Sequence, residues 1–362
     1  MTIIPQGPRV PRWRVPGVIR LAEPYPRNNN LNLIRALAAL AVLVSHAWPL
    51  ALGKGTEQPL MAATGFPLGT QALYVFFTIS GFLVTRSWLC RRDPRGWLRA
   101  RALRLLPGLA VALALTAFVA GPLLTTLPPR DYLATAETWA YVPRGLSFAW
   151  RQSALPGVFA DHPHASETNG SLWSLEFEVT CYAAVFLVGL LRGFDTRPRL
   201  VLLILALVAV KAATALMPGS FPPRLLNLVS LGFPFALGAT LWIGRGWLPL
   251  SPLILAALVL VLALFWQTGL QRILYVVVLS YATILIAHVP TGPLQLYNRL
   301  GDYSYGIYVY AWPVQQTVTG LAGPLSPPTN ILLALPVVLS LAILSWHLLE
   351  KPALARARNP RA

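Results

Sequence analysis

Apolar segments alternate with polar connections along almost the whole chain, and most of these segments are about 20 residues long. A helix of about that length crosses the roughly 30 Å hydrocarbon core of a bilayer. The pattern predicts an all-α integral membrane protein, a bundle of about ten transmembrane helices. The predicted spans are 33–52, 70–88, 104–125, 171–191, 200–217, 225–243, 250–267, 271–288, 301–320 and 330–349.

The basic residues indicate the orientation of these spans. Cytoplasmic connections of membrane proteins are enriched in Lys and Arg. Most of the 29 Lys and Arg residues lie in the two ends of the chain or on the connections that share a face with them. We therefore expect both termini in the cytoplasm. Basic cytoplasmic tails at 1–32 and 350–362 are expected to flank a membrane domain at 33–349.

The connection at 126–170 is the only long one on the predicted outer face. Its Pro, Gly, Trp and Ser content predicts an ordered loop with little regular structure, and loops of this length are often functional. Asp161, His162 and His164 are metal-ligand types within it. Their spacing is not helical and no further ligand is evident, so we expect no metal.

Composition excludes two other classes of protein. Hydrophobic residues make up 56% of the chain and charged residues 11%, whereas a soluble domain has about a quarter of its residues charged. The net charge of +17 is interpreted as membrane orientation rather than nucleic-acid binding. The two cysteines lie at the edge of or within apolar segments, so no disulfide framework or cysteine zinc site organises the fold.

Two ionisable residues on the first span suggest a pathway. A charged side chain at the centre of a span costs about 2.5 to 3.5 kcal/mol, so it needs a reason. Arg35 and His46 are three helical turns apart, on one face and about 16 Å apart along the axis. Glu178 on the fourth span is expected at the depth of His46. An alternative stays open, in which His46 only joins helices through hydrogen bonds.

The remaining polar residues near span ends have simpler interpretations. Asp302, His288 and His347 are interpreted as structural, because titratable groups cost little at the interface. Arg101 and Arg104 are one helical turn apart where the third span begins, so they are candidates for a two-pronged anion grip. Binding of anionic lipid headgroups is the alternative for this basic segment.

Six groups of residues, in order and on the expected spans, resemble motifs of the acyltransferase-3 family of ten-span membrane O-acyltransferases. They lie at 35–46, 76–83, 101–107, 155–178, 303–308 and 350–352. They include Arg35 with His46, Phe76-Phe77-Thr78-Ile79-Ser80-Gly81-Phe82, Arg101-Ala102-Leu103-Arg104, and Asn169-Gly170-Ser171-Leu172-Trp173-Ser174 leading to Glu178. One departure is Ala311, where many relatives carry a histidine.

The resemblance implies transfer of an acyl group, with acetyl expected, from cytoplasmic acyl-CoA to a hydroxyl of an extracytoplasmic glycan or small molecule. His46 is then the general base, because an imidazole titrates near neutral pH. Glu178 orients that imidazole or holds the acceptor. The residues expected to bind the donor are Arg35, Arg101 and Arg104. The residues expected to line the pocket are Phe77, Ser80, Trp173, Tyr305 and Tyr308.

Acyl-CoA is expected as a co-substrate, with no permanently bound cofactor and no nucleic-acid partner. The expected location is the inner or plasma membrane, with multiple spans. Direct transfer and an acyl-enzyme on His46 both remain open. The competing hypothesis is a multispan transporter or exporter of a polar metabolite, although we find none of the inverted repeats typical of that class.

Overall fold

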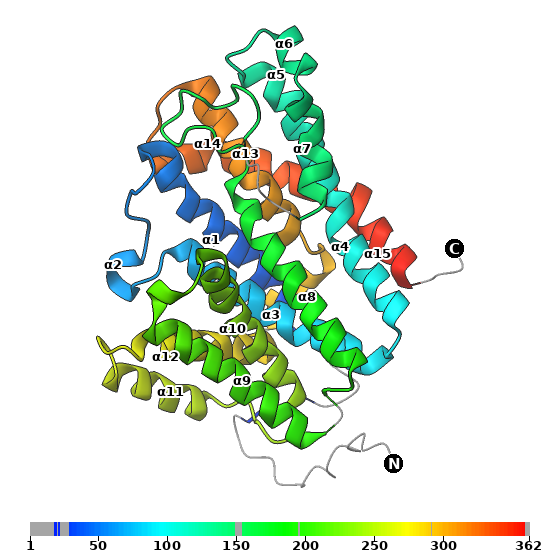
Figure 1. Cartoon of the computed structure of the whole chain (residues 1–362), viewed down its shortest axis with the longest axis vertical. Coiled ribbons are helices and arrows are strands. Elements are labelled where there is room, and N and C mark those ends of the chain that lie inside the picture. The colour runs from blue at the N-terminus through cyan, green and yellow to red at the C-terminus, as the bar shows by residue number, and fades with distance from the viewer. Residues whose placement is uncertain are drawn as a thin grey trace. The chain divides into compact units, whose positions relative to one another are not determined.

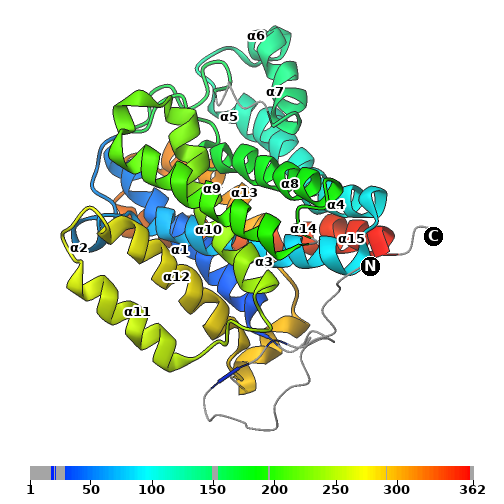
Figure 2. The same ribbon diagram turned by 60° about the horizontal axis from the view of Figure 1, so that its bottom comes forward.

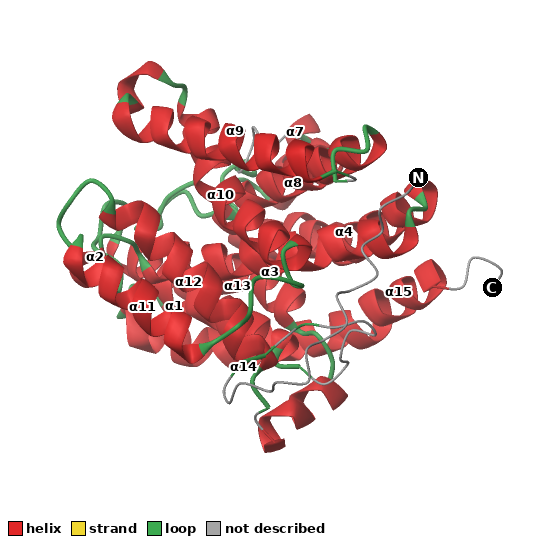
Figure 3. Cartoon of the chain, turned by 90° about the horizontal axis from the view of Figure 1, so that it is seen from below, coloured by secondary structure: helices red, strands yellow, loops and turns green. Residues whose placement is uncertain are grey.

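A computed structural model describes residues 18–19, 21, 29–148, 154–194, 196–290 and 292–358. Most of the tail predicted at 1–32, and the last residues of the one at 350–362, lie outside these ranges. Within them the chain is helical, with no named strand and with isolated bridges only at Ile19–Leu250 and Thr125–Val158. Figure 3 shows this helical content in red.

The helices follow the apolar segments. Several begin with proline at their first position, where the missing N–H costs nothing, as in Pro94, Pro223, Pro252 and Pro327. The elements are α1 Leu31–Leu52, α2 Met61–Thr64, α3 Leu68–Arg91, α4 Pro94–Leu115, η1 Thr116–Ala120, α5 Gly121–Leu124, α6 Pro129–Ala134, α7 Ala136–Leu146, η2 Gly170–Leu172, α8 Trp173–Leu190, α9 Arg197–Leu216, η3 Pro218–Ser220, α10 Pro223–Ile243, α11 Pro252–Leu264, α12 Gln271–His288, η4 Gly292–Arg299, α13 Ser304–Ala322, α14 Pro327–Ser345, η5 Trp346–Glu350 and α15 Lys351–Arg358.

Each predicted span falls on a helix, and this confirms an all-helical, multi-pass membrane protein. In the part of the chain described, 7 helices are long and apolar enough to cross a bilayer: Leu31–Leu52, Leu68–Arg91, Pro94–Leu124, Gly170–Leu190, Pro223–Ile243, Gln271–His288 and Pro327–Ala357. The helix α11 is shorter, with 13 residues, and α13 carries several polar side chains. The count of ten and the cytoplasmic termini therefore stay predictions.

The expectation of little regular structure in the connection at 126–170 was wrong. Its described residues include two helices, α6 and α7. On α7, Thr138 and Tyr141 are buried three residues apart, which gives the helix an inward face. The Tyr132 hydroxyl donates to the Ala117 carbonyl at 2.7 Å, and the Thr138 hydroxyl donates to the Tyr132 carbonyl at 2.8 Å. These contacts dock the two helices onto the end of the preceding span, which loop-type composition alone does not reveal.

The chain divides into two compact units. Unit 1 comprises Met1–Ile34, Leu73–Pro94 and Phe177–Arg299. Its core is a cluster of Leu21, Phe82, Trp242, Leu250, Tyr281, Ile284 and Leu285. The Asn30 amide donates to the carbonyls of Ile286 and Val289 at 2.9 Å each, which ties the start of α1 to the end of α12. The helices α11 and α12 pack side by side (Figure 2).

Unit 2 comprises Arg35–Ala72, Arg95–Glu176 and Leu300–Ala362. Its most extensive helix pair is α13 with α14, which lie side by side in Figure 1. A Cβ added at Gly306 on α13 would lie 2.7 Å from the Cα of Ala342 on α14. Only glycine permits this approach of the two backbones. The close packing makes α13 a rigid support for the polar side chains described next.

Candidate active site

His46 projects from α1 into a polar region of unit 2. The Ser171 hydroxyl on η2 lies 3.4 Å from its Nδ1. The indole of Trp312 on α13 meets the imidazole edge to face, with ring centroids 4.8 Å apart and planes at 77°. The side chain is partly exposed. His46 is therefore held on two sides and is not wholly covered by the protein, which leaves room for the role of a general base.

The backbone around His46 is fixed by a buried amide network. Gln315 on α13 donates from Nε2 to the Leu43 carbonyl at 3.1 Å and to Asn330 Oδ1 at 2.9 Å. Beside the imidazole, the Ser45 hydroxyl donates to Gln58 Oε1 at 2.6 Å. Gln315 and Asn330 are fully buried, and buried polar groups with partners position the chain strongly. The network joins α1, α13 and α14.

The segment before α8 carries a second imidazole, that of His164, which contacts the same Trp312 ring as His46. His164 Nε2 lies 2.7 Å from Glu167 Oε2. The His164 ring also contacts Trp312 edge to face, with centroids 5.0 Å apart. The indole Nε1 of Trp312 donates to the Glu167 carbonyl at 2.9 Å, and Gln316 Nε2 donates to the His164 carbonyl at 2.8 Å. Trp312 thus touches both imidazoles and holds the segment between them.

Electrostatics favour an ionised Glu167. The hydrogen bond from His164 holds the pKa of this carboxyl below its ordinary value. Burial acts in the opposite direction but is outweighed, because the neighbouring basic side chains His164, Lys54 and His46 also lower the pKa. Glu167 is a carboxylate at neutral pH.

Two of the predicted pocket residues, Tyr308 and Tyr305, form hydrogen bonds that stabilise the surroundings of His46. The Tyr308 hydroxyl donates to the Ser171 carbonyl, and it lies 2.6 Å from the Ser174 hydroxyl. The Tyr305 hydroxyl donates to the Leu105 carbonyl at 2.7 Å, which joins α13 to α4. Both tyrosines are buried, whereas Trp173 is exposed. Tyr308 positions the residue that contacts His46.

Arg35 and Arg104 converge on one carboxylate. Arg35 Nη1 and Arg104 Nη2 lie 2.6 and 2.7 Å from Asp302 Oδ2, and Arg104 Nη1 lies 3.3 Å from Glu350 Oε2. The Ser304 hydroxyl donates a hydrogen bond to the other carboxylate oxygen of Asp302, Oδ1, at 2.5 Å. The structure therefore joins Arg35 to Arg104 through an anion.

Arg101 has a different setting from Arg104. Its guanidinium carbon lies 5.9 Å from the ring centroid of Trp97, one turn earlier on α4. The predicted grip of Arg101 with Arg104 stays a prediction. The pairing that the structure does show, Arg35 with Arg104 through Asp302, was not expected, since Asp302 was interpreted as a structural residue at a span end.

Glu178 lies in unit 1, where it forms a cluster with another predicted residue. The Ser80 hydroxyl donates to Glu178 Oε1 at 3.0 Å, and the Tyr182 hydroxyl donates to the same oxygen at 2.5 Å. Phe77, on the helix that carries Ser80, is buried. The cluster confirms none of the predicted roles, and cooperation of Glu178 with His46 stays a prediction.

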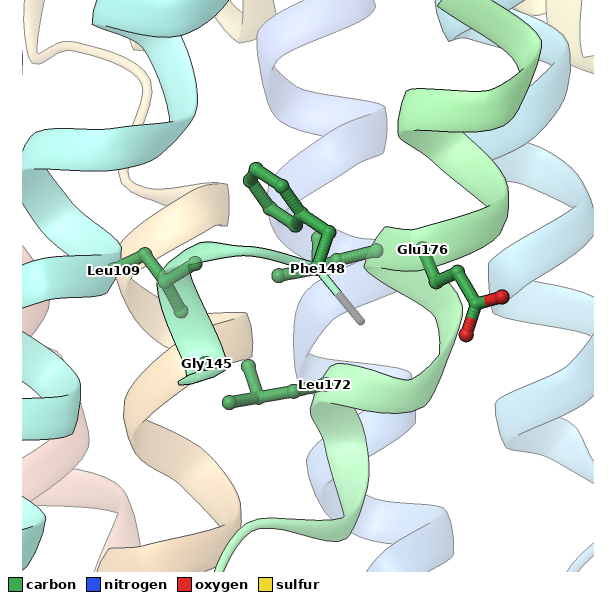
Figure 4. A pocket seen from close by; sticks show the side chains of 6 residues that line it. Leu109, Gly145, Phe148, Leu172 and Glu176 are labelled. Carbon is green, nitrogen blue, oxygen red and sulfur yellow. The ribbon is translucent and has the colours of Figure 1, made fainter. Parts of the chain in front are cut away.

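A small pocket of unit 2 lies apart from the predicted site residues. It is lined by Leu109, Gly145, Phe148, Leu172, Leu175 and Glu176. Figure 4 shows the Glu176 carboxylate on the side away from Leu109, so the pocket wall is mostly apolar. Among the residues described, no group of three His, Cys, Asp or Glu side chains is arranged to hold a metal ion.

The fold and site define a class: a multi-pass helical membrane protein with a partly exposed imidazole among buried polar side chains. The family model for the acyltransferase domain, acyltransferase-3, matches residues 28–349, and the chain belongs to this family. The chain is therefore a membrane acyltransferase, which favours catalysis over the transporter hypothesis.

Curated relatives cover nearly the whole chain. One is the O-acetyl transferase of Shigella phage Sf6, which is 31% identical over 91% of this chain and 97% of its own length. Nodulation protein 10 of Rhizobium leguminosarum bv. viciae is 30% identical, covering 90% of this chain and 93% of its own. The putative membrane-bound transacylase BcsY of Komagataeibacter xylinus is 28% identical, and the match covers 85% of this chain and 78% of the relative's own length. No solved structure matches.

Sequence reasoning missed four residues of these clusters: His164, Glu167, Asp302 and Glu350. His164 was considered only as a metal ligand, and Glu350 only as part of a motif. The usable signal was their chemistry, because each is a titratable residue close to a predicted span end. The sequence does not show which residue each of them contacts, since partners such as Arg35 and Asp302 are separated by 267 positions.

Proposed function

We propose that this acyltransferase moves an acetyl group from cytoplasmic acyl-CoA to a hydroxyl of an extracytoplasmic glycan or small molecule, with His46 as general base. The observation that carries the proposal is the His46 imidazole, partly exposed and held by Ser171 and Trp312. The relative from Shigella phage Sf6 is an O-acetyl transferase by name, which supports an acetyl group and an acceptor oxygen as the reacting groups. The protein is proposed to work in the inner or plasma membrane.

The chemical step follows from this geometry. His46 Nδ1 faces the Ser171 hydroxyl, so Nε2 is assigned to the reaction. It takes the proton of the acceptor hydroxyl while that oxygen bonds to the thioester carbonyl carbon. The tetrahedral intermediate then breaks its carbon–sulfur bond, and the departing CoA thiolate takes the proton from the imidazolium. A positioned general base of this kind contributes about 10² to 10⁴ in rate.

The donor is proposed to bind through its phosphates to Arg35 and Arg104, with Arg101 nearby on the same helix. Two guanidinium groups already hold one carboxylate oxygen of Asp302, and charge-assisted hydrogen bonds of that kind suit a phosphate equally well. Glu178 is proposed to orient the imidazole or hold the acceptor, with Ser80 and Tyr182 fixing its carboxylate.

The decisive experiment replaces His46 in cells that display the natural acceptor. Surface glycans and exported metabolites are compared by mass spectrometry between cells with the wild-type protein, with His46→Ala and without the protein. His347→Ala is the matched control, because this histidine is exposed. We expect the acetyl increment from the wild type and from His347→Ala, and none from His46→Ala at equal membrane expression. Wild-type acetylation by His46→Ala refutes the assignment.

A further inference from the structure

The His46 imidazole needs a nearby negative charge that the reaction above does not supply. When His46 takes the acceptor proton it becomes a cation among apolar and uncharged groups, including the Trp312 ring. An uncompensated charge in such surroundings raises the energy of the state that carries it. A carboxylate on the same wall of the site would lower the barrier by its attraction.

Glu167 is placed to supply that charge. A Cβ added at Gly170 would lie 2.7 Å from a ring carbon of Trp312 and 2.9 Å from the carboxyl carbon of Glu167. Gly170 therefore lets the indole and the carboxylate pack against one short stretch of backbone. The next residue, Ser171, is the one whose hydroxyl faces His46 Nδ1 at 3.4 Å. Trp312, Glu167 and His46 thus meet around two consecutive residues.

Two contacts fix the position of Glu167, and a third fixes its partner His164. His164 binds its carboxylate at 2.7 Å, and Trp312 holds its carbonyl at 2.9 Å. Gln316 anchors the His164 carbonyl at 2.8 Å. His164 is itself buried, whereas 32% of the Glu167 side chain is exposed, so the hydrogen bond holds the carboxylate at the edge of the protein interior. The position of the Glu167 carboxylate is therefore fixed by hydrogen bonds to its side chain and its backbone.

We propose that Glu167, oriented by His164, is a positioning residue that stabilises the positive charge on His46 during proton transfer. The inference rests on the proposed function of His46. Of the other titratable groups around Glu167, His164 and Lys54 are basic, and they moderate its charge. The facing side chains of α13 and η2, Trp312, Gln316 and Ser171, are uncharged.

Replacing Glu167 should change the pH dependence of the rate in a defined direction. Transfer needs a neutral His46 at the start, and the Glu167 carboxylate favours its protonated form. Replacing the carboxylate by the isosteric amide in Glu167→Gln should therefore move the acid limb of the pH–rate profile to lower pH. The rate on the plateau should fall by about tenfold or more, the change that one unit of basicity represents.

The experiment uses membranes that contain the full chain and the natural acceptor, with acetyl-CoA as the probe and release of the CoA thiol as readout, across about pH 5 to 9. Glu167→Asp keeps the charge and should retain the position of the acid limb. Glu137→Gln is the matched control, since Glu137 is exposed on α7 in the same connection. We expect the control to behave as wild type.

The outcomes separate the two proposals. If His46→Ala keeps full activity, the proposed function fails. If His46→Ala is inactive but Glu167→Gln keeps the wild-type rate and pH profile, only the role of Glu167 fails. If Glu167→Gln and Glu167→Asp lose the same activity with an unshifted profile, Glu167 is merely structural and the inference is overturned.

Discussion

Asp302 should be a main stabilising residue of unit 2, and Asp302→Asn tests this directly. The side chain of Asp302 is 10% exposed and that of Arg104 11%, so their attraction is little screened by water. Besides the two arginines, Asp302 Oδ1 accepts a hydrogen bond from the Ser304 hydroxyl at 2.5 Å. The amide keeps the shape of the carboxylate but removes the negative charge that Arg35 and Arg104 share, so Arg104 keeps only its longer contact with the Glu350 carboxylate, at 3.3 Å, among these ion pairs.

Breaking a buried ion pair by removing one partner costs about 3 to 5 kcal/mol. Arg35 is more exposed than Arg104, with 22% of its side chain accessible, so we expect a loss near the lower value, about 3 kcal/mol. The assay is the thermal midpoint of the detergent-solubilised protein, measured for wild type, Asp302→Asn and the control Asp93→Asn, which is exposed. The midpoint should fall by several degrees for Asp302→Asn alone. Equal thermal midpoints for wild type and Asp302→Asn at pH 7 would refute the reasoning.

Two further predictions concern the donor site and the helix packing. Arg104→Ala should raise the KM for acetyl-CoA about tenfold or more, because it removes a charged hydrogen-bond donor. Arg99→Ala is an exposed control on the same helix and should leave the KM unchanged. An unaltered KM for Arg104→Ala would exclude this residue from donor binding. Gly306→Ala should destabilise the protein by about 1 to 3 kcal/mol, because the new Cβ meets Ala342. Gly269→Ala is the control, since its Cβ meets no atom within 4 Å, and equal thermal midpoints for the two variants would contradict the packing.

Local chemistry determined much of this protein. Long apolar segments in a chain with few charges specify helices that cross a membrane, because the backbone can satisfy its hydrogen bonds in lipid only within such a helix. The 11-residue spacing of Arg35 and His46 likewise places both on one face of α1. The motifs around these residues indicated the family, which the family match then confirmed.

Only the tertiary structure decided which polar side chains meet. Periodicity reports the face of a helix that is buried, but not the helix against which it packs. The contact of Arg104 with Asp302 spans 198 positions, and that of Trp312 with the Glu167 carbonyl spans 145. Such pairs depend on how α1, α4 and α13 pack together in unit 2. Thus the sequence determined the chemistry available to the site, and the packing decided that Asp302 joins the arginines and that Glu167 and His164 meet Trp312 beside His46.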